Sequence, residues 1–491
     1  MDRTSILICE QYEVYAVRMQ TIPARRAAQI WRPALDRARG PIYRAIADEI
    51  ERAVEAGELA AGDRLPPHRA LAAGLGVDLT TVTRAYAEAR RRGLLDGVVG
   101  RGTFVRAVRD PAPDGRDTGP DTLDLGMNLP PRPADPALPD LLRRGLSDLL
   151  AGPDAPGLLG YRHGAGTGEE RAAGAAWLRP TLGDVDPGRV LLAPGAQPAL
   201  LAVLGTLARP GDTVLTDALT YPGFRAAAAR LGVRLAGVPA DADGMLPDAV
   251  DAACRASRPK ALYCIPTIQN PTAATMPRAR RHALVETAAR HGLPIIEDDA
   301  YGLLPSEPLP ALAALAPGLT YHVATLSKAL SPALRVAYVV APDPGEAARL
   351  AASLRANTLM ASPLLTGLAT AWIRGGTAHA LLDAIRRECA ARQRAAREAL
   401  PAGSFDAHPE GLHLWLRLPP RRGRLEFVSR VRQQGLALVP SDAFTVEGAV
   451  PPDAVRVSLG AAPGLDRLRR ALRRMAAALQ EDAPAPFLDV V

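Results

Sequence analysis

Two stretches of the chain decide the fold: LPIIEDDAYGLL at residues 293–304 and YHVATLSKALSPALRVAYVV at residues 321–340. Each opens with a short apolar run, which is typical of a buried parallel strand. The first run ends at acidic residues that include Asp298, and the second ends just before Lys328. Because α/β sheets place their ligand sites at the carboxyl ends of such strands, we expect an acid and an amine to meet at one edge of a sheet.

Lys328 is unusual in this chain, which has 59 basic residues but only two lysines, Lys260 and Lys328. An arginine guanidinium stays protonated, whereas a desolvated lysine amine can form an imine with an aldehyde. An ordinary surface lysine is an adequate interpretation of Lys260. It suits Lys328 poorly, because that residue follows a predicted buried strand. Taken alone, Lys328 leaves an aldehyde-binding lysine and an ordinary lysine equally open, and the motifs around it favour the first.

Apolar runs and alanine-rich segments alternate around these stretches, as in a doubly wound α/β domain. A long helix is predicted from about Gly376 to Leu400. The segments GLHLWLRLP, GLALVP and AVRVSLG after it predict a smaller α+β subdomain. The strands predicted for the large domain are RVLLAPG, TVLTDAL, VRLAGVP, ALYCIPT, LPIIEDD, YHVATL and LRVAYVVAP.

Four short motifs follow one another here: Asn270-Pro271, Asp298-Asp299-Ala300-Tyr301, Thr325-Leu326-Ser327-Lys328 and Arg335. Together they resemble the signature of the fold-type I aminotransferases, which carry pyridoxal phosphate (PLP), over about residues 123–479. The resemblance implies that Lys328 holds PLP as an imine and that Asp298 keeps the pyridine nitrogen protonated, which makes the ring an electron sink. It also implies that Asn270 and Tyr301 hydrogen-bond to the ring 3-oxygen. The catalytic residues expected from it are Lys328, Asp298 and Tyr301.

A phosphate site is expected where RVLLAPG runs into Gly195-Ala196-Gln197. Backbone N–H groups at the start of the following helix would bind an anion there. The resemblance adds the hydroxyls of Thr325 and Ser327 and the guanidinium of Arg335 as phosphate ligands. An ordinary tight turn is the alternative interpretation of Gly195.

Three more residues take roles from the same resemblance. Tyr221 matches the aromatic residue that stacks on the pyridine ring, with an ordinary core tyrosine as the alternative. Tyr161 matches the tyrosine that reaches the phosphate of the neighbouring subunit, which implies a homodimer with shared sites. Arg456 matches the arginine that binds a substrate α-carboxylate, a role that suits its bidentate guanidinium; in so arginine-rich a chain, a structural arginine is the alternative. No histidine spacing indicates a metal site.

A second domain is predicted before this one. PIYRAIADEIERAVEAGEL has apolar residues at helical spacing, and HRALAAGLG and VTRAYAEARRRG predict two short helices in a helix-turn-helix pattern. LLDGVVGRGTFVRA then predicts two strands around the tip at residues 100–102, which form a wing. The whole segment resembles the winged-helix DNA-binding domain of the GntR family, through GDRLPP, the TV-RAY stretch and GRGTFV.

The expected DNA contacts fall into base readers and phosphate or minor-groove contacts. The chain departs from the family at two positions. Leu79 stands where the family often has an arginine, and Asp78 stands at a serine position. Whether residues 78 and 79 contact bases is therefore left open. Arg90, Arg91 and Arg92 are weaker candidates, because a charge run on a helix is more often a solvated face. The residues expected at the DNA are Thr80, Thr81 and Arg84 in the major groove, and Arg69 and Arg101 on phosphates or in the minor groove.

Composition sets the remaining expectations. The 491 residues are 48% hydrophobic with a net charge of +7, which allows several cores and a polyanionic partner. Positive charge gathers at residues 84–106, where six arginines face two acids. With no long apolar run, no secretion signal and four scattered cysteines, we expect a cytoplasmic protein that does not enter a membrane. Met19 is an alternative start.

The expected order has six parts. They are an N-terminal extension at 1–39, a winged helix at 40–107, a Pro- and Gly-rich linker at 108–122, an aminotransferase-like domain at 123–482, its small subdomain at about 376–482, and a tail at 483–491. The fold class is therefore multidomain, an α+β winged helix-turn-helix joined to an α/β fold-type I domain.

This combination resembles the MocR family of bacterial transcription regulators. The resemblance implies a dimer that binds operator DNA and senses an amino acid, an amine or PLP itself through the imine on Lys328. A true aminotransferase acting on an amino acid and a 2-oxo acid, with an accessory winged helix, is the alternative, because the residues for a transamination half-reaction are all present. The regulator is favoured, since a winged helix has no use in transamination.

Overall fold

The computed structural model describes residue 31 and residues 41–55, 58–59, 63–91, 94–98, 102–105, 122–162, 165–420 and 422–480. Contacts divide the chain into two units, Met1–Ala112 and Pro113–Val491. Several predicted features lie outside the described residues: the extension at 1–39 apart from Trp31, the linker up to residue 121, Arg101, and the tail at 483–491. No helix among the described residues is long and apolar enough to cross a bilayer.

The N-terminal unit is a small helical domain with a hairpin. Its core takes one face of each helix, including Ile46 and Ile50 of the first and Val82 and Tyr86 of the third, and Trp31 packs against it. Gly76, left-handed at φ 64°, ends the second helix and lets the third begin a few residues later, which makes the helix-turn-helix. The helices are α1 (Ile42–Glu55), α2 (His68–Leu75) and α3 (Leu79–Arg91).

The predicted wing is present as an antiparallel pair, β1 (Leu95–Val98) and β2 (Gly102–Val105). β2 is also tied to the segment before α2, because Leu65 N donates to Thr103 O at 2.9 Å and Val105 N donates to Asp63 O at 2.8 Å. These bonds fix the wing to the helices and complete a winged helix-turn-helix.

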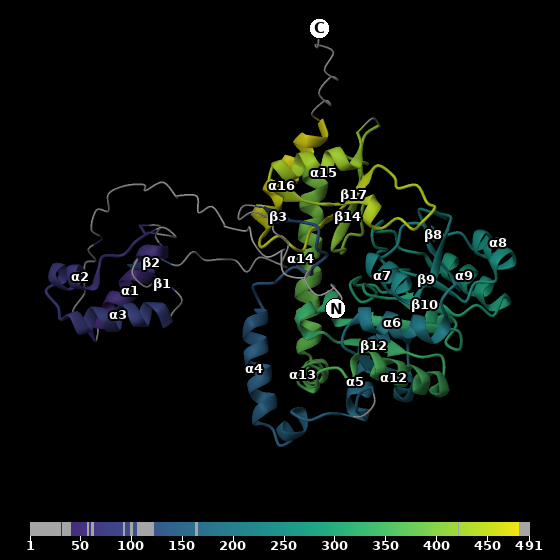
Figure 1. Ribbon diagram of the computed structural model, residues 1–491, viewed down its shortest axis with the longest axis horizontal. Coiled ribbons are helices and arrows are strands. Elements are labelled where there is room, and N and C mark those ends of the chain that lie inside the picture. The colour runs from purple at the N-terminus through teal and green to yellow at the C-terminus, as the bar shows by residue number, and fades with distance from the viewer. Residues whose placement is uncertain are drawn as a thin grey trace, which may run out of the picture. The chain divides into compact units, whose positions relative to one another are not determined.

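The second unit has a large lobe built on one seven-stranded sheet, which contains all seven predicted strands (Figure 1). Neighbouring strands are parallel except β12, which is antiparallel to both β11 and β4. The connection from β11 to β12 is too short for the crossover that a parallel strand requires. In sheet order the strands are β4 (Val190–Ala193), β12 (Ala337–Val340), β11 (Thr320–Thr325), β10 (Ile295–Asp298), β9 (Ala261–Cys264), β5 (Thr213–Asp217) and β6 (Arg234–Val238).

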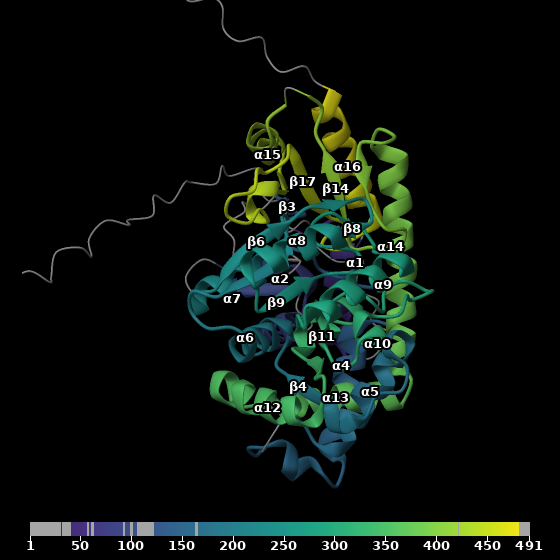
Figure 2. The same cartoon turned by 90° about the vertical axis from the view of Figure 1, so that its right-hand side faces the viewer.

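Helices cover both faces of this sheet (Figure 2). Alternate strand residues point to opposite faces, so that Ile296 belongs to one hydrophobic core and Ile295 to the other. The face of Ile295 packs against α8 (Pro247–Ser257), α9 (Arg278–Arg290) and α10 (Leu312–Leu315). The face of Ile296 packs against α5 (Gly168–Leu182), α6 (Ala196–Leu207), α7 (Pro222–Leu231), α12 (Pro344–Thr358) and α13 (Pro363–Arg374).

A small lobe with its own core follows the long helix α14 (Thr377–Ala399). Residues of the first half of α14, such as Leu381, belong to the core of the large lobe, and Ala395 and Ala396 belong to that of the small lobe. The helix therefore links the two lobes as one continuous element (Figure 1). The small lobe also recruits β3 (Leu123–Asp124) from far earlier in the chain, which pairs in parallel with β15 (Leu436–Ala437).

The small-lobe sheet has the order β13-β14-β17-β16. Its strands are β13 (Phe405–Asp406), β14 (His413–Arg417), β16 (Val439–Pro440) and β17 (Ala454–Ser458), covered by α15 (Arg424–Gln433) and α16 (Leu465–Gln480). The remaining elements are α4 (Leu138–Ala151), η1 (Ala155–Leu158), η2 (Pro187–Arg189), β7 (Ala240–Asp241), β8 (Gly244–Met245), α11 (Leu326–Ala329), η3 (Pro332–Leu334) and η4 (Ser441–Ala443).

Candidate cofactor and DNA sites

Asp298 ends β10 with its carboxylate buried. Tyr263 of the neighbouring strand donates a hydrogen bond to Asp298 Oδ2 at 2.7 Å, whereas Oδ1 has no partner among the described residues. Burial raises the pKa of Asp298 to about 6, and the hydrogen bond from Tyr263 opposes that rise. An acceptor oxygen without a partner in a dry site is ready to bind a donor, such as a protonated ring nitrogen.

Lys328 lies in the single turn of α11 that follows β11. Its Nζ donates to the backbone oxygen of Asn128 at 2.5 Å. Burial and the charge of Arg456 lower the pKa of Lys328 to about 8, and the negative charge of Asp298 opposes the fall. The acid and the amine expected at this sheet edge are thus close enough to influence each other's ionisation.

Asn128 is a site residue that the sequence analysis missed. Its Nδ2 lies 2.9 Å from Tyr301 Oη and 3.0 Å from His413 Nδ1, while its backbone oxygen accepts from Lys328. His413 Nε2 faces Gln269 O at 3.1 Å, so this nitrogen carries the hydrogen and Nδ1 accepts. Burial lowers the pKa of His413 to about 3, which keeps the ring neutral. The only signal for Asn128 in the sequence was a polar residue in the otherwise apolar stretch LGMNLPP.

Arg456 lies on β17 of the small lobe and reaches residues of the large lobe. Its Nη1 donates to Asn270 Oδ1 at 2.7 Å, and its Nη2 donates to Gly126 O. Its guanidinium carbon lies 4.9 Å from the centre of the Phe444 ring. Tyr301 is buried nearby, and burial raises the pKa of its phenol. The predicted residues Asn270, Tyr301 and Arg456 therefore belong with Lys328 to one cluster of polar side chains in the interior.

The start of α6 forms a cradle beside this group. Gly195, at φ 106°, caps the helix without a side-chain bond to the first turn. A Cβ at Gly195 would lie 2.7 Å from Arg335 Nη2, which itself donates to Pro194 O at 3.2 Å. Thr325 Oγ1 donates to Ser327 Oγ at 3.0 Å. The first turn of α6 presents the backbone N–H groups of Ala196 and Gln197, since Pro198 has no N–H and Ala199 N donates to Gly195 O. Two N–H groups at a helix start, with the Arg335 guanidinium close to Gly195, are features of an anion site.

Aromatic side chains line the same region. Tyr221 precedes α7, and burial together with the charge of Asp298 raises the pKa of its phenol. Gln197 donates through Nε2 to Gly223 O at 2.6 Å, next to the Tyr221 ring. Phe224 stacks on Tyr263 with ring centres 3.6 Å apart, which holds the tyrosine that binds Asp298. Tyr161, by contrast, is 83% exposed and does not join this buried group within one chain.

In the N-terminal unit, Arg69, Thr80 and Arg84 are exposed and Thr81 is half-buried. The Arg84 guanidinium lies 4.5 Å from the centre of the Tyr43 ring, which holds its stem on the surface of α3. Leu79 is 40% exposed at the first position of the helix. Arg90 donates to Thr103 Oγ1 at 3.1 Å, so it links α3 to β2.

The residues present fit PLP. An unpartnered carboxylate oxygen suits its ring nitrogen, a lysine with a lowered pKa suits its aldehyde, and the α6 cradle suits its phosphate. The described residues contain no group of three or more His, Cys, Asp or Glu side chains arranged for a metal ion.

Comparisons with known proteins agree with this assignment. Residues 120–475 match the aminotransferase class I and II family, and residues 42–105 match the gntR family of bacterial regulatory proteins. The uncharacterized HTH-type transcriptional regulator YdeF of Bacillus subtilis is 31% identical over 90% of this chain and 95% of its own. The vitamin B6 salvage pathway transcriptional repressor PtsJ of Salmonella typhimurium is 30% identical over 84% of this chain and 93% of its own.

A solved structure has a similar fold. The α-aminoadipate aminotransferase LysN of Thermus thermophilus, complexed with N-(5'-phosphopyridoxyl)-L-leucine, is 28% identical and has a TM-score of 0.64. The match covers 73% of this chain and 93% of LysN.

The chain therefore belongs to the aminotransferase class I and II family, with the fold-type I architecture and PLP as its cofactor. With its GntR-type winged helix, it is more narrowly a transcriptional regulator of the MocR type.

Proposed function

We propose that this regulator senses an amino compound, or PLP itself, at Lys328, and that binding of this compound at Lys328 changes the affinity of the protein for operator DNA. The observation that carries the proposal is a single chain that holds an exposed helix α3 and, in its other unit, a half-buried lysine amine near a carboxylate whose Oδ1 has no partner among the described residues. PLP supplies an aldehyde that links covalently to a lysine amine and can be passed to another amine.

Different residues of the chain would bind different parts of PLP and of the amino compound. Asp298 would hold the ring nitrogen, and the start of α6 with Thr325, Ser327 and Arg335 would hold the phosphate. Lys328 would provide the amine, which loses its proton more readily than an ordinary lysine because it is buried beside Arg456. An amino compound that replaces Lys328 at the aldehyde carbon would free the lysine, and Arg456 would bind its carboxylate.

We propose a homodimer with shared sites. Tyr161 supports it, because its side chain is 83% exposed although it matches a cofactor-binding position. A tyrosine that serves the site of a second copy would be exposed in one chain alone. The dimer would present two recognition helices to an operator with two half-sites.

The sensor proposal is tested by cofactor absorbance. Wild-type protein should take up PLP with an imine absorbance band, and borohydride should fix the label on Lys328. Lys328→Ala should lose the band, whereas Lys260→Ala, which changes the only other lysine and an exposed one, should keep it. A labelled Lys260, or an unchanged band in Lys328→Ala, would contradict the proposal.

The DNA proposal is tested with the fragment upstream of the gene itself. Wild-type protein should bind it selectively, with affinity that falls as salt rises. Arg84→Ala should weaken binding by about tenfold or more, as expected for the loss of a base contact. Arg52→Ala is the matched control, because Arg52 on α1 is held by Glu49 and Glu58 at 2.8 and 3.0 Å. Equal binding by both variants would exclude our placement of α3.

Aminotransferase activity is the second candidate, favoured by the presence of both Lys328 and Arg456 in one buried group. Lys328 could then carry a proton between substrate and cofactor. Rapid multiple turnover with an amino acid and a 2-oxo acid would establish this candidate. A single spectral change without turnover would favour the sensor.

A further inference from the structure

A short segment of the small lobe, residues 441–446, lies against the large lobe beside the cofactor site. Thr220 N donates to Phe444 O at 2.9 Å, and Val446 N donates to Ala218 O at 3.0 Å. An isolated antiparallel bridge joins Leu219 to Thr445. This segment, here called the strap, therefore pairs with the backbone that leads directly into Tyr221.

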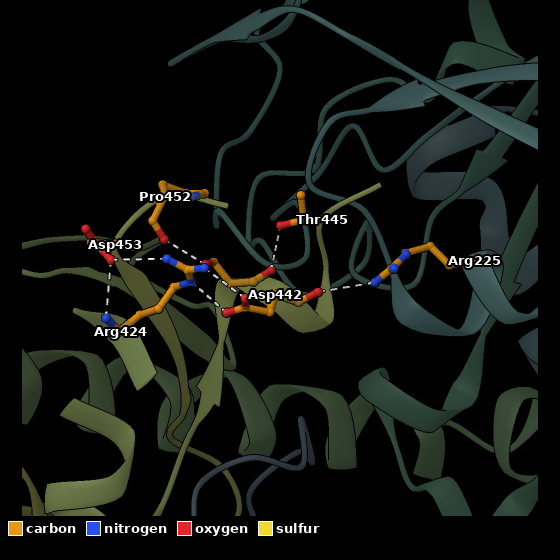
Figure 3. Close-up of polar contacts among 7 residues, drawn as sticks. Arg225, Arg424, Asp442, Thr445, Pro452 and Asp453 are labelled. Carbon is orange, nitrogen blue, oxygen red and sulfur yellow. Dashed lines mark hydrogen bonds and ion pairs between the residues drawn. The ribbon is translucent and has the colours of Figure 1, made fainter. Parts of the chain in front are cut away.

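Side chains from both lobes hold the strap in place (Figure 3). Arg424 of α15 binds Asp442 through two bonds of 2.6 and 2.9 Å and also reaches Asp453 at 3.3 Å. From the large lobe, Arg225 of α7 donates to the backbone oxygen of Ala443 at 2.6 Å. The bidentate geometry of the Arg424–Asp442 pair restrains direction as well as distance.

Two further hydrogen bonds hold the strap, one to Pro452 outside it and one within it. Ser441 Oγ donates to Pro452 O at 2.6 Å, and Thr445 Oγ1 donates to Ser441 O at 2.9 Å (Figure 3). Both bonds hold Ser441, the first residue of the turn η4, and so restrain the turn that directly precedes Phe444.

Phe444 is fully buried and connects the strap to the ligand-binding arginine. Its ring packs edge-on against Trp415 with centres 6.3 Å apart, and the Arg456 guanidinium lies 4.9 Å from its centre. Asn270 Oδ1 and Gly126 O bind the two terminal nitrogens of the same guanidinium. The cation–π contact with Phe444 adds a restraint on the position of the guanidinium to those of the two hydrogen bonds at its tip.

We infer that the strap is a positioning element for Arg456, in which Phe444 aims the guanidinium and the Arg424–Asp442 pair holds Phe444. The strap thereby sets the preference of the site for ligands that carry a carboxylate beside the amine. A bidentate contact needs a guanidinium held in one plane. If Arg456 were held less firmly, the site would bind ligands with a carboxylate more weakly. Its affinity for an amine without a carboxylate would stay the same.

This inference rests on the proposed binding of an amino compound at Lys328 and Arg456. It adds residues that touch neither ligand nor cofactor. Asp442 and Arg424 have side chains 39% and 23% exposed, so their substitution leaves the core of the lobe intact. The strap also pairs with the backbone before Tyr221. A ligand bound by Arg456 would therefore restrain residues of both lobes.

The test compares two ligands that differ only by a carboxylate. L-Leucine and 3-methylbutylamine are titrated into the full-length PLP-bound protein, and the change in cofactor absorbance gives a dissociation constant for each. The measured quantity is the ratio of the two constants. Asp442→Asn and Arg424→Gln should reduce the preference for L-leucine by about two- to fivefold, as expected for a half-exposed ion pair. Phe444→Leu should reduce it by about threefold to thirtyfold, the range of a cation–π contact.

Matched controls remove the same charges away from the strap. Asp406→Asn breaks the Arg417–Asp406 pair in the same lobe, and Arg430→Gln breaks the pair with Glu426 on the same helix α15. Both should keep the wild-type ratio. The amine constant should stay unchanged in every variant, which a general loss of structure would not allow.

The outcomes are distinct. If wild-type protein prefers L-leucine and the strap variants keep that preference, the strap inference is overturned while the sensor proposal stands. If the amine constant changes as much as that of L-leucine, the strap is merely structural and the inference fails. If the wild type shows no preference or binds neither ligand, Arg456 does not bind a ligand carboxylate, and the strap inference is overturned as well.

Discussion

Two consecutive carboxylates at the end of β10, Glu297 and Asp298, occupy different environments because a strand sends neighbouring side chains to opposite faces. Asp298 points to the face of Tyr263, which binds it. Glu297 points to the other face, where it accepts from the backbone N–H of Leu312 at 2.7 Å and lies 2.9 Å from His322 Nδ1. These bonds lower the pKa of Glu297 despite its burial. Glu297 is therefore held as a structural anion, whereas Asp298 keeps an oxygen without a partner among the described residues, which we propose for the cofactor ring.

The pKa of Lys328 predicts how cofactor uptake depends on pH. A pKa lowered to about 8 leaves roughly a tenth of the amine neutral at pH 7, against about one part in three thousand at the ordinary value of 10.5. Only the neutral amine attacks an aldehyde. The rate at which PLP-free protein takes up PLP should thus rise nearly tenfold per pH unit below pH 8 and level off above it. Stopped-flow absorbance from pH 6.5 to 9.5 measures this.

Lys260→Ala should give the same pH profile, because that lysine is exposed and outside the site. A rate that still rises steeply at pH 9.5 would mean that Lys328 titrates like a lysine in water. In that case burial and Arg456 would not activate it.

The positions of Asp298 and Lys328 at the sheet edge could be predicted, because each follows an apolar run that predicts a strand. Asn128 and Gly126 escaped prediction because they lie in irregular backbone, and their contacts with Lys328 and Arg456 join residues hundreds of positions apart. No pattern in the sequence indicates a role for His413. It lies on β14 and accepts from Asn128, a contact that only the packing of the two lobes creates.

At the scale of elements, the turn from β4 into α6 depends on a glycine. Gly195 has φ 106°, where a side chain is strained, and a Cβ would come within 2.7 Å of Arg335 Nη2. Gly195→Ala should therefore displace Arg335 and raise the dissociation constant for PLP by about tenfold or more, equivalent to the 1–3 kcal/mol of such strain. Fluorescence titration with PLP measures it, and thermal unfolding confirms that the variant is folded.

Gly205→Ala is the control on the same helix. A Cβ at Gly205 would meet Leu231 at an ordinary 3.7 Å, and alanine is favoured over glycine inside a helix by about 0.5–1 kcal/mol. This variant should bind PLP as wild type does and unfold at a slightly higher temperature. If Gly195→Ala behaved in the same way, the α6 turn would not be the phosphate site.

The sequence predicted elements well where periodicity was strong. All seven strands of the large sheet carry apolar runs, six of them followed within a few residues by Pro, Gly or Asp, and the long helix after Gly376 shows helical spacing. It did not reveal the direction of β12, which the length of one connection decides. It also did not reveal β3, only two residues long, because its pairing with β15 spans most of the domain.

At the scale of the whole molecule, the winged helix and the cofactor site belong to separate units of one chain. If binding at one site alters binding at the other, the coupling free energy must be the same in both directions. PLP should then change the dissociation constant for the upstream DNA fragment by about fivefold or more, the lower end of typical couplings. Saturating DNA should change the dissociation constant for PLP by the same factor.

Fluorescence anisotropy of labelled DNA, with and without saturating PLP, measures the first factor, and PLP titration with and without DNA measures the second. Lys328→Ala should bind DNA equally well in both conditions, because it lacks the amine that we propose links PLP to the protein, whereas Lys260→Ala should retain the wild-type difference. Coupling in wild type that persists in Lys328→Ala would show that PLP acts on DNA binding by some other contact. Unequal factors in the two directions would mean that PLP or DNA also binds elsewhere on the chain, since a single pair of linked sites requires them to agree.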